Sequence, residues 1–375
     1  MGPHPYSKLP DSAYWRRAVA QAVDLDPMTE PPFRFGVSDA VVAAGSCFAQ
    51  HIGRYLKANG YNYLVTEPAH PMVSHQAELR LNYGLFSARY GNIYTPRQLI
   101  QLFDRAYGRF KPREDVWRES GGMVLDPFRP QIQPGGFNGE RELQFDRDRH
   151  FRAVRDAFEK LDIFVFTLGL TEAWRSREDG AIFPLCPGVA GGAFDASRHE
   201  FVNFDVDGIV SDMNAFITRL RGVNPKAQVI LTVSPVPLMA TAERRHVLVS
   251  TVYSKSALRV ACEILARQNG VAYFPSYEIV AGGFASDYFA SDRRSVTEEG
   301  VAHVMRIFSR HFLKKPFAKL AIGRALDIVT GRSRENAELR AIEEVVKVMC
   351  DEEALDLDGA SPSHQHGPGL KGDRV

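Results

Sequence analysis

The chain has 375 residues, of which 45% are hydrophobic and 24% are charged, and its formal net charge is +1. This composition is typical of a globular protein, and the near-zero net charge argues against a nucleic-acid or acidic-membrane partner. The four cysteines form no CxxC pair, so we expect neither a zinc site, nor a disulfide framework, nor a metal or other cofactor. The N-terminus lacks a signal-peptide pattern and no apolar run could span a membrane, which favours a cytoplasmic protein.

Predicted strands alternate with predicted helices along the chain. The first half gives helix 12–23, strand 40–44, helix 48–59, strand 61–65, helices 75–85 and 95–107, and an excursion over 108–145. The second half gives helix 148–160, strand 162–168, an excursion over 175–204, helix 207–222, strand 228–233, helix 252–269, strand 271–274 and helix 298–312. Continuous apolar strands between helices indicate a parallel sheet covered on both faces. We therefore predict an α/β fold built as a three-layer α/β/α sandwich.

Two helix starts carry specific signals. Thr95-Pro96 is a plausible N-cap followed by proline at the first helical position. Ser254 or Ser256 is expected to open the helix over 252–269.

The pattern divides the chain into four parts. We expect an N-terminal helix and connector over 1–37, the α/β domain over 38–313, and a helical extension over 314–354. That extension includes an amphipathic helix at 333–350. The acidic and then Gly-, Pro- and His-rich tail over 355–375 is predicted to be disordered, with His364 and His366 reflecting its composition rather than a metal site.

The first strand ends in Gly45-Ser46-Cys47, directly before a helix. Ligands of open α/β sheets bind at the carboxyl ends of strands, where helix N-termini also favour negative charge. A serine at this point can act as a nucleophile, although a tight strand-to-helix turn also prefers small residues. Polar residues gather at the other predicted strand ends, at Thr171 and Glu172 and at Ser234, which favours the site interpretation over simple turns.

Gly45-Ser46-Cys47-Phe48-Ala49 resembles the motif that names the GSCFA domain family, which is related to SGNH/GDSL-type esterases and acyltransferases. The resemblance covers about residues 38–313 and includes further segments in the same order: 91–96, 232–236, 254–255, 273–278 and the segment around Asp292. It implies a flavodoxin-like α/β/α fold. It also implies an acyl-ester hydrolase or O-acyltransferase, whose substrate would be an acylated small molecule or a glycan.

The resemblance assigns roles by position. Ser46 matches the nucleophile, and the backbone N–H groups of Ser46 and Gly91, with Asn92 beside them, would form the oxyanion hole. Thr171 stands where SGNH enzymes have an asparagine donor. Cys47, Glu172, Ser234, His246 and Arg294 are the expected substrate-binding residues.

The catalytic base is the main departure from this pattern. SGNH enzymes carry Asp-x-x-His before the closing helix, whereas this chain has Asp292 and then Ser295, which cannot accept a proton at neutral pH. Another histidine could replace the missing one, and the candidates are His75, His199, His246 and His303. Alternatively, Ser46 or Cys47 works with Asp292 or Glu172 through water, or the protein binds an acylated ligand without turnover.

The remaining charged candidates have structural alternatives. Glu172 follows a buried strand, so it needs a partner such as Arg80, Arg89 or Arg294, and a structural ion pair is as good an interpretation as an acid/base role. The arginine pairs 244–245 and 293–294 could bind the phosphates of an acyl-coenzyme A, or simply lie in solvent. Three hypotheses therefore stand: a catalyst of acyl-ester chemistry, a non-catalytic glycan- or acyl-coenzyme-A-binding protein, and a structural or partner-binding protein that uses the helix at 333–350.

Overall fold

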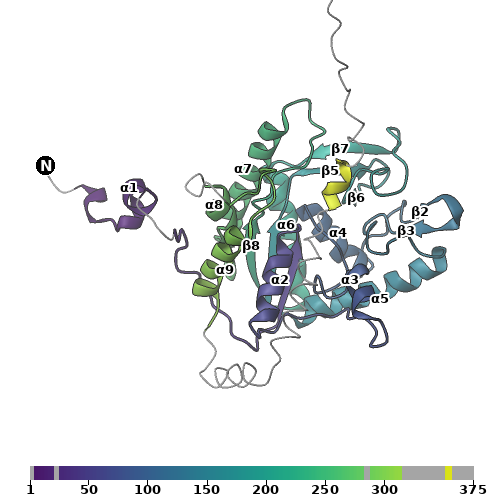
Figure 1. Cartoon of the computed structure of the whole chain (residues 1–375), viewed down its shortest axis with the longest axis horizontal. Coiled ribbons are helices and arrows are strands. Elements are labelled where there is room, and N and C mark those ends of the chain that lie inside the picture. The colour runs from purple at the N-terminus through teal and green to yellow at the C-terminus, as the bar shows by residue number, and fades with distance from the viewer. Residues whose placement is uncertain (1–3, 21–24, 283–287, 315–350, 357–375) are drawn as a thin grey trace, which may run out of the picture.

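A four-stranded parallel sheet forms the centre of the computed structural model, which describes residues 4–20, 25–282, 288–314 and 351–356 (Figure 1). Its strands are β1 (Val41–Gly45), β4 (Ile163–Leu168), β8 (Gln228–Val233) and β9 (Val271–Phe274), in the order β1-β4-β8-β9. The strand predicted at 61–65 is reduced to one parallel bridge, between Tyr63 and the outer side of β1 at Val41. With this bridge counted, the order is the 2-1-3-4-5 of flavodoxin-like folds.

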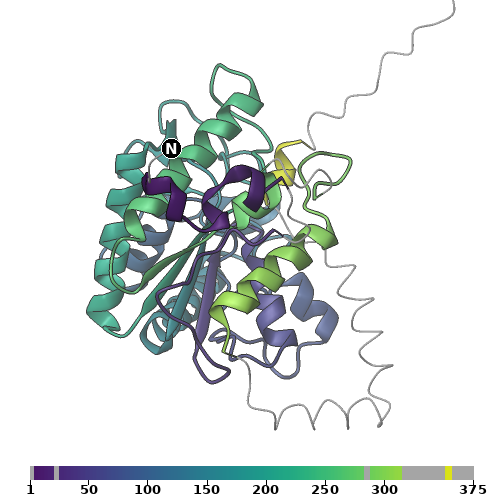
Figure 2. The same ribbon diagram turned by 90° about the vertical axis from the view of Figure 1, so that its left-hand side faces the viewer.

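Helices cover both faces of the sheet, as the alternating strand side chains require (Figure 2). Phe164 and Phe166 of β4 face one helical layer, and Ile163 and Val165 face the other. The first layer consists of α4 (Pro96–Ala106), α5 (Glu140–Lys160), α6 (Val206–Val223) and α7 (Val247–Leu265). The second consists of α2 (Ala49–Ala58), α8 (Ser276–Ala281) and α9 (Glu298–Phe312). The predicted three-layer α/β/α architecture is confirmed.

Both predicted excursions contain ordered structure. The chain before and within the first holds α3 (His75–Arg80) and the antiparallel pair β2 (Trp117–Arg118) and β3 (Val124–Leu125), with the turn η3 (Ser120–Gly122) between them. The second holds an antiparallel sheet of β5 (Glu172–Ser176), β6 (Ile182–Phe183) and β7 (His199–Asn203).

A buried ion cluster ties the first excursion to the domain. The Asp126 carboxylate lies 3.0 Å from Arg129, 3.5 Å from Arg147 of α5 and 3.9 Å from Arg105 of α4. Burial raises the pKa of Asp126, but the three guanidinium groups outweigh it and hold the pKa well below the usual range.

The N-terminal helix is shorter than predicted, with η1 (Pro5–Lys8), η2 (Asp11–Ala13) and α1 (Trp15–Ala18) in place of a single element. At the other end, η4 (Asp351–Leu355, yellow in Figure 1) contacts Asn92 through Asp351 and Arg294 through Glu352. The predicted helix at 333–350 and the tail from 357 lie outside the described residues. Among the helices that the structure describes, none has the length and apolar character needed to cross a membrane.

Candidate active site

Ser46 lies at the carboxyl end of β1, in the turn that leads into α2. Its backbone N–H donates to the carbonyl of Thr167 in the neighbouring strand at 3.1 Å, so the sequence-based expectation that this N–H serves an oxyanion is wrong for this conformation. The side chain is only 3% exposed, and its Oγ has no hydrogen-bond partner. Its hydrogen-bonding capacity is therefore not used by any described protein group.

The Ser46 side chain faces a small cavity at the carboxyl edge of the sheet. Its lining comes from the ends of β1, β4 and β8, from α7, and from η4, and the residues are Ser46, Cys47, Tyr94, Gly169, Leu170, Ser234, Val236, Pro237, Leu238, Lys255 and Glu352. Gly169 is needed for the approach of these strands, because an added Cβ would lie 3.1 Å from the Ser46 Cβ and 3.1 Å from the Tyr94 ring. The predicted convergence of Ser46, Cys47 and Ser234 is therefore present.

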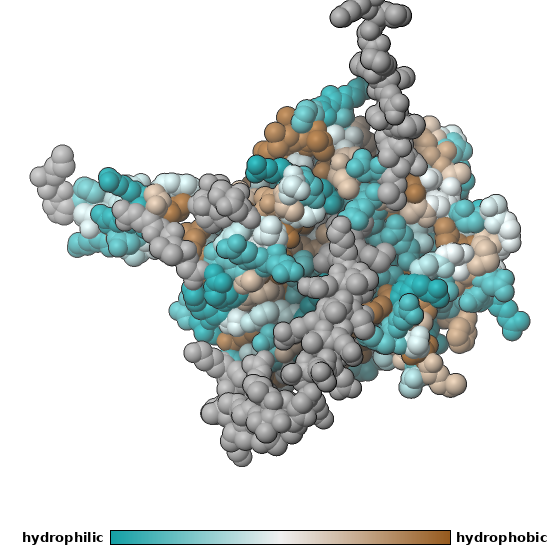
Figure 3. All heavy atoms as spheres, viewed as in Figure 1, coloured by the Kyte–Doolittle hydropathy of each residue, from teal (hydrophilic) through white to brown (hydrophobic). Residues whose placement is uncertain are grey.

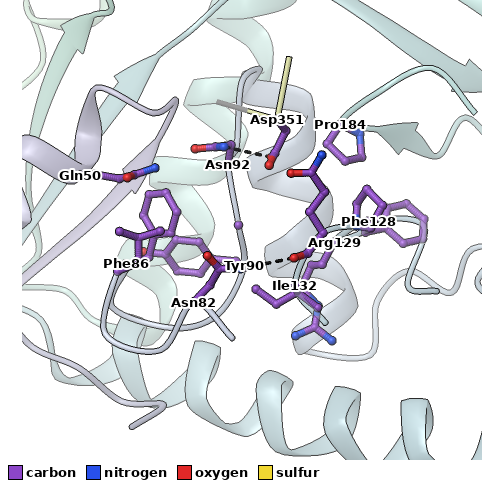
Figure 4. Close-up of a pocket in the computed structure, with 14 residues that line it drawn as sticks. Gln50, Asn82, Phe86, Tyr90, Asn92, Phe128, Arg129, Ile132, Pro184 and Asp351 are labelled. Carbon is purple, nitrogen blue, oxygen red and sulfur yellow. Dashed lines mark hydrogen bonds between the residues drawn. The ribbon is translucent and has the colours of Figure 1, made fainter. Parts of the chain in front are cut away.

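The segment 91–94 is fixed against the same strand ends. Ile93 N–H donates to the Gly45 carbonyl at 2.8 Å, and the Tyr94 carbonyl accepts from Gly169 N–H at 2.9 Å. Gly91 adopts φ = +70°, in the left-handed region that favours glycine. Gly91 and Asn92 line a second, slightly larger cavity, which neighbours the first (Figure 4).

A lysine that sequence reasoning missed lies in the Ser46 cavity. Lys255 is 1% exposed, and its Nζ donates to the Gly169 carbonyl at 2.6 Å. Burial lowers the pKa of Lys255 to about 7; Glu352 opposes this shift and Arg294 adds to it. The signal was available in the sequence, because Lys255 follows the spacing of the buried α7 positions Leu258 and Cys262.

Two acidic side chains of η4 reach the two cavities. Asp351 lines the larger cavity, where its Oδ2 accepts from Asn92 Nδ2 at 3.0 Å (Figure 4). Glu352 lines the Ser46 cavity, and its Oε2 accepts from Arg294 Nη2 at 2.9 Å. Burial raises the pKa of both carboxyl groups, that of Asp351 to about 6. Sequence analysis had placed both residues in a helical extension and gave them no role.

Asp292 and Ser295 pair with each other rather than with the cavity. The Ser295 hydroxyl donates to Asp292 Oδ2 at 2.6 Å on an exposed turn, and Asp292 Oδ1 accepts from the backbone N–H groups of Arg294 and Ser295. Neither residue lines the Ser46 cavity.

No described histidine lines the Ser46 cavity. His75 lies 3.5 Å from Glu78 on the surface, and His199 contacts Glu114 at 2.9 Å. His246 is exposed and caps α7 by accepting from Leu248 N–H. The buried His303 contacts the Tyr288 hydroxyl and the Leu25 carbonyl. Each histidine named as a replacement base is thus held at a different place.

Thr171 and Glu172 have partners outside the cavity. The Thr171 hydroxyl donates to Asn203 Oδ1 at 2.6 Å, and its backbone N–H donates to Ser254 Oγ at 3.0 Å. The partners of Glu172 are the Thr241 hydroxyl at 2.6 Å and the Ala242 N–H at 3.2 Å, so the expected arginine partners were wrong. Burial raises the pKa of Glu172.

The cysteines differ from the sequence-based expectation. Cys186 and Cys262 are free thiols, as expected, whereas Cys47 is disulfide-bonded. Motif spacing such as CxxC finds only local pairs, so a pair brought together by the fold was missed. Among the described residues, no group of three or more His, Cys, Asp or Glu side chains could hold a metal ion.

The fold and the site together define an α/β/α protein with a serine at the carboxyl edge of a flavodoxin-like sheet. The model of the GSCFA family matches residues 40–308, and the chain belongs to this family. The search of curated proteins finds no match.

Two solved structures are similar over most of their length. One is a crystal structure of an acetyl esterase, a serine-to-alanine mutant with acetate ion, at 12% identity and a TM-score of 0.33. The other is a carbohydrate esterase of family 3 from Talaromyces cellulolyticus, at 13% identity and a TM-score of 0.32. Each alignment covers 72% of this chain and 95% of the other chain.

Proposed function

We propose that this protein catalyses acyl-ester chemistry with Ser46 as the nucleophile, and that its main reaction is hydrolysis. One observation carries the proposal: Ser46 Oγ is buried, has no hydrogen-bond partner and faces a cavity at the carboxyl edge of the sheet. A hydroxyl with an unused hydrogen-bonding capacity can approach a carbonyl carbon without first breaking a protein contact.

The substrate proposed is the acyl ester of a small molecule or a glycan. Attack of Ser46 on its carbonyl creates an oxyanion that needs hydrogen-bond donors. Gly91 N–H and the Asn92 side chain are the proposed donors, because the segment 91–94 is bonded to the ends of β1 and β4 beside Ser46. Transfer to a second hydroxyl, with an acyl-coenzyme A as the acyl donor, is the alternative fate of the same acyl-serine.

The test is turnover of p-nitrophenyl acetate by the wild type and by Ser46→Ala. We expect the substitution to lower kcat/KM by about 10³-fold or more, as for other serine nucleophiles. Cys186→Ser is the matched control, since this free thiol lies outside the Ser46 cavity and should not contribute. Equal rates for wild type and Ser46→Ala would remove Ser46 from the mechanism.

A non-catalytic binding protein is the second candidate, and it is favoured by the missing imidazole in the cavity. It predicts no Ser46-dependent turnover, together with calorimetric binding of an acetylated oligosaccharide or an acyl-coenzyme A. Turnover that Ser46→Ala abolishes would exclude it.

A further inference from the structure

Ser46 needs a proton acceptor, and the Ser46 cavity contains one amine and no imidazole among the described residues that line it. We propose that Lys255 is the general base of the reaction proposed above, in place of the histidine that Ser295 has replaced. This inference rests on the proposed function of Ser46.

Gly169 links the two side chains. Its carbonyl accepts from Lys255 Nζ at 2.6 Å, and its Cα faces Ser46 closely enough that an added Cβ would lie 3.1 Å from the Ser46 Cβ. Ser46 Oγ has no partner that would hold its rotamer, and both side chains line the same cavity.

The surroundings of Lys255 suit a base. A lysine that is 1% exposed loses the hydration that stabilises its ammonium form, and neutral lysine is a competent proton acceptor. Burial lowers its pKa to about 7, so a substantial neutral fraction exists at neutral pH. Asp292 lies on an exposed turn with Ser295 and takes no part.

Lys255 can carry out every proton transfer of the reaction without a second acid or base. Neutral Lys255 takes the Ser46 hydroxyl proton as Oγ bonds to the ester carbonyl carbon, and the resulting ammonium gives that proton to the leaving alkoxide as the ester C–O bond breaks. Water then attacks the acyl-serine and gives a proton to Lys255. That proton returns to Ser46 Oγ as the acid is released.

The test is the rate of Ser46 labelling by a fluorophosphonate probe between pH 5.5 and 8.5. We expect the wild-type rate to rise through a pKa of about 7, and Lys255→Arg and Lys255→Met to lose about 10²-fold or more together with this inflection. Lys226→Met is the control, because this lysine is exposed and pairs with Asp162 away from the cavity.

Two results would overturn the role of Lys255 while leaving Ser46 in place. One is Lys255→Arg labelling within about threefold of wild type with an unchanged pH profile. The other is a flat wild-type profile across this range, which holds even if the variants fail to fold. Labelling of Ser46→Ala at the wild-type rate would instead refute the proposed function itself.

The segment η4 carries a second, independent inference. We propose that Asp351 and Glu352 form an autoinhibitory strap over the candidate active site. These two adjacent residues enter two adjacent cavities, Asp351 the one lined by Gly91 and Asn92, and Glu352 the one lined by Ser46.

The contacts of the strap imitate those of a bound acid. The Asp351 carboxylate accepts from Asn92, a proposed oxyanion donor, at 3.0 Å, so it uses a hydrogen bond that the oxyanion would need. Glu352 accepts from Arg294 at 2.9 Å beside the Ser46 cavity. While Asp351 is docked, this Asn92 hydrogen bond is not available to a substrate oxygen.

The strap is also built to be released. Burying two carboxylates is costly, and hydrogen bonds from the Asn92 side chain and backbone to Asp351 and from Arg294 to Glu352 offset part of this cost. The raised pKa of both groups shows that their ionised forms are under-stabilised in the docked position. The two side chains can therefore leave the cavities locally while the backbone on either side of them stays in place.

Charge reversal in the full-length chain tests the strap. Asp351→Arg/Glu352→Arg should undock it through repulsion from Arg294 and Lys255, and should raise the rate of Ser46 fluorophosphonate labelling by about tenfold or more. Glu353→Arg/Asp356→Arg is the matched control, because it makes the same charge change at two exposed residues of the same segment. Asp351→Ala/Glu352→Ala should also raise the rate of Ser46 labelling, without introducing bulky arginine side chains.

A rate that stays within about twofold of wild type in both cavity-side variants would overturn the strap. So would a fall in rate, which would mean that these carboxylates assist the reaction, or an equal rise in the control. Adding Ser46→Ala to the released variant should abolish labelling. If it does not, the proposed function fails rather than the strap.

Discussion

Gly45 determines how closely β1 approaches β4 directly before Ser46. Its φ is +138°, and an added Cβ would lie 2.3 Å from the Thr167 carbonyl oxygen and 2.7 Å from the Thr167 nitrogen. Neither atom can move without distorting the sheet, since both belong to the backbone of β4. The glycine of this motif is therefore explained by packing, independently of any reaction.

We predict that Gly45→Ala lowers the free energy of unfolding by about 3 kcal/mol or more, from overpacking combined with backbone strain. Urea denaturation followed by circular dichroism measures this. Gly222→Ala is the control: this glycine lies within α6 with no atom near its added Cβ, so it should stabilise by about 0.5–1 kcal/mol. Equal effects of the two substitutions would contradict the packing argument.

At the same scale, sequence reasoning located Ser46, Cys47 and Ser234, because strand ends of a parallel sheet must meet at one edge. It missed Lys255, since a charge on the buried side of a helix appears as an interruption of the apolar pattern. The strap was beyond reach, because nothing local in the sequence says that residues 351–352 return to a strand end some 300 positions earlier.

Among the elements, those with an apolar face were predicted best. The bounds of β8, β9 and α9 agree with the prediction, whereas α5 begins at Glu140 instead of 148. The reason is that its first turns bury Arg147 against Asp126, so a helix face is buried without being apolar.

The start of α7 was wrong for the opposite reason. It begins at Val247, capped by His246, and not at Ser254 or Ser256. Leu248, Val249 and Val252 of its first turns are more than half exposed and contribute to the apolar surface in Figure 3. A helix is predicted from the regular spacing of its buried apolar residues. The apolar residues of these first turns face solvent, so that spacing does not reveal where the helix begins.

The cap of α4 was predicted correctly and supports the segment 91–94. Thr95 Oγ1 accepts from Gln98 N–H at 3.2 Å, and Gln98 Oε1 accepts from Thr95 N–H at 3.0 Å. We predict that Thr95→Ala lowers the free energy of unfolding by about 1–2 kcal/mol. Thr95→Ser should keep most of the stabilisation that the cap provides, because serine also has a hydroxyl group. Thermal unfolding of both variants measures the difference, and an equal loss in both would show that the Thr95 methyl group, not the cap, matters.

On the scale of the whole molecule, the strap couples the C-terminal segment to the sheet edge through groups that titrate. Burial raises the pKa of Asp351 to about 6; Asn92 opposes this shift and Glu352 adds to it. The charged groups that act on Glu352, the other strap carboxyl, are Arg294, Lys255 and Glu172. A solvated aspartate has a pKa of about 4, so the docked carboxyl group holds its proton more tightly than the undocked one. Docking is therefore strongest below about pH 4 and weakens as the pH rises to about 6.

Asp351→Asn removes this titration and leaves Glu352, Arg294 and Lys255 in place. We predict that wild type and variant are labelled at Ser46 at similar rates near pH 4.5, and that wild type becomes faster by about tenfold by pH 6.5, because only its strap acquires a buried charge. Fluorophosphonate labelling across this range gives the ratio of the wild-type rate to the variant rate. Lys255 and Glu352 are present in both proteins, so their titration affects both rates and cancels in the ratio. A ratio that stays constant or falls as the pH rises would show that Asp351 does not control docking, whatever the outcome at Ser46.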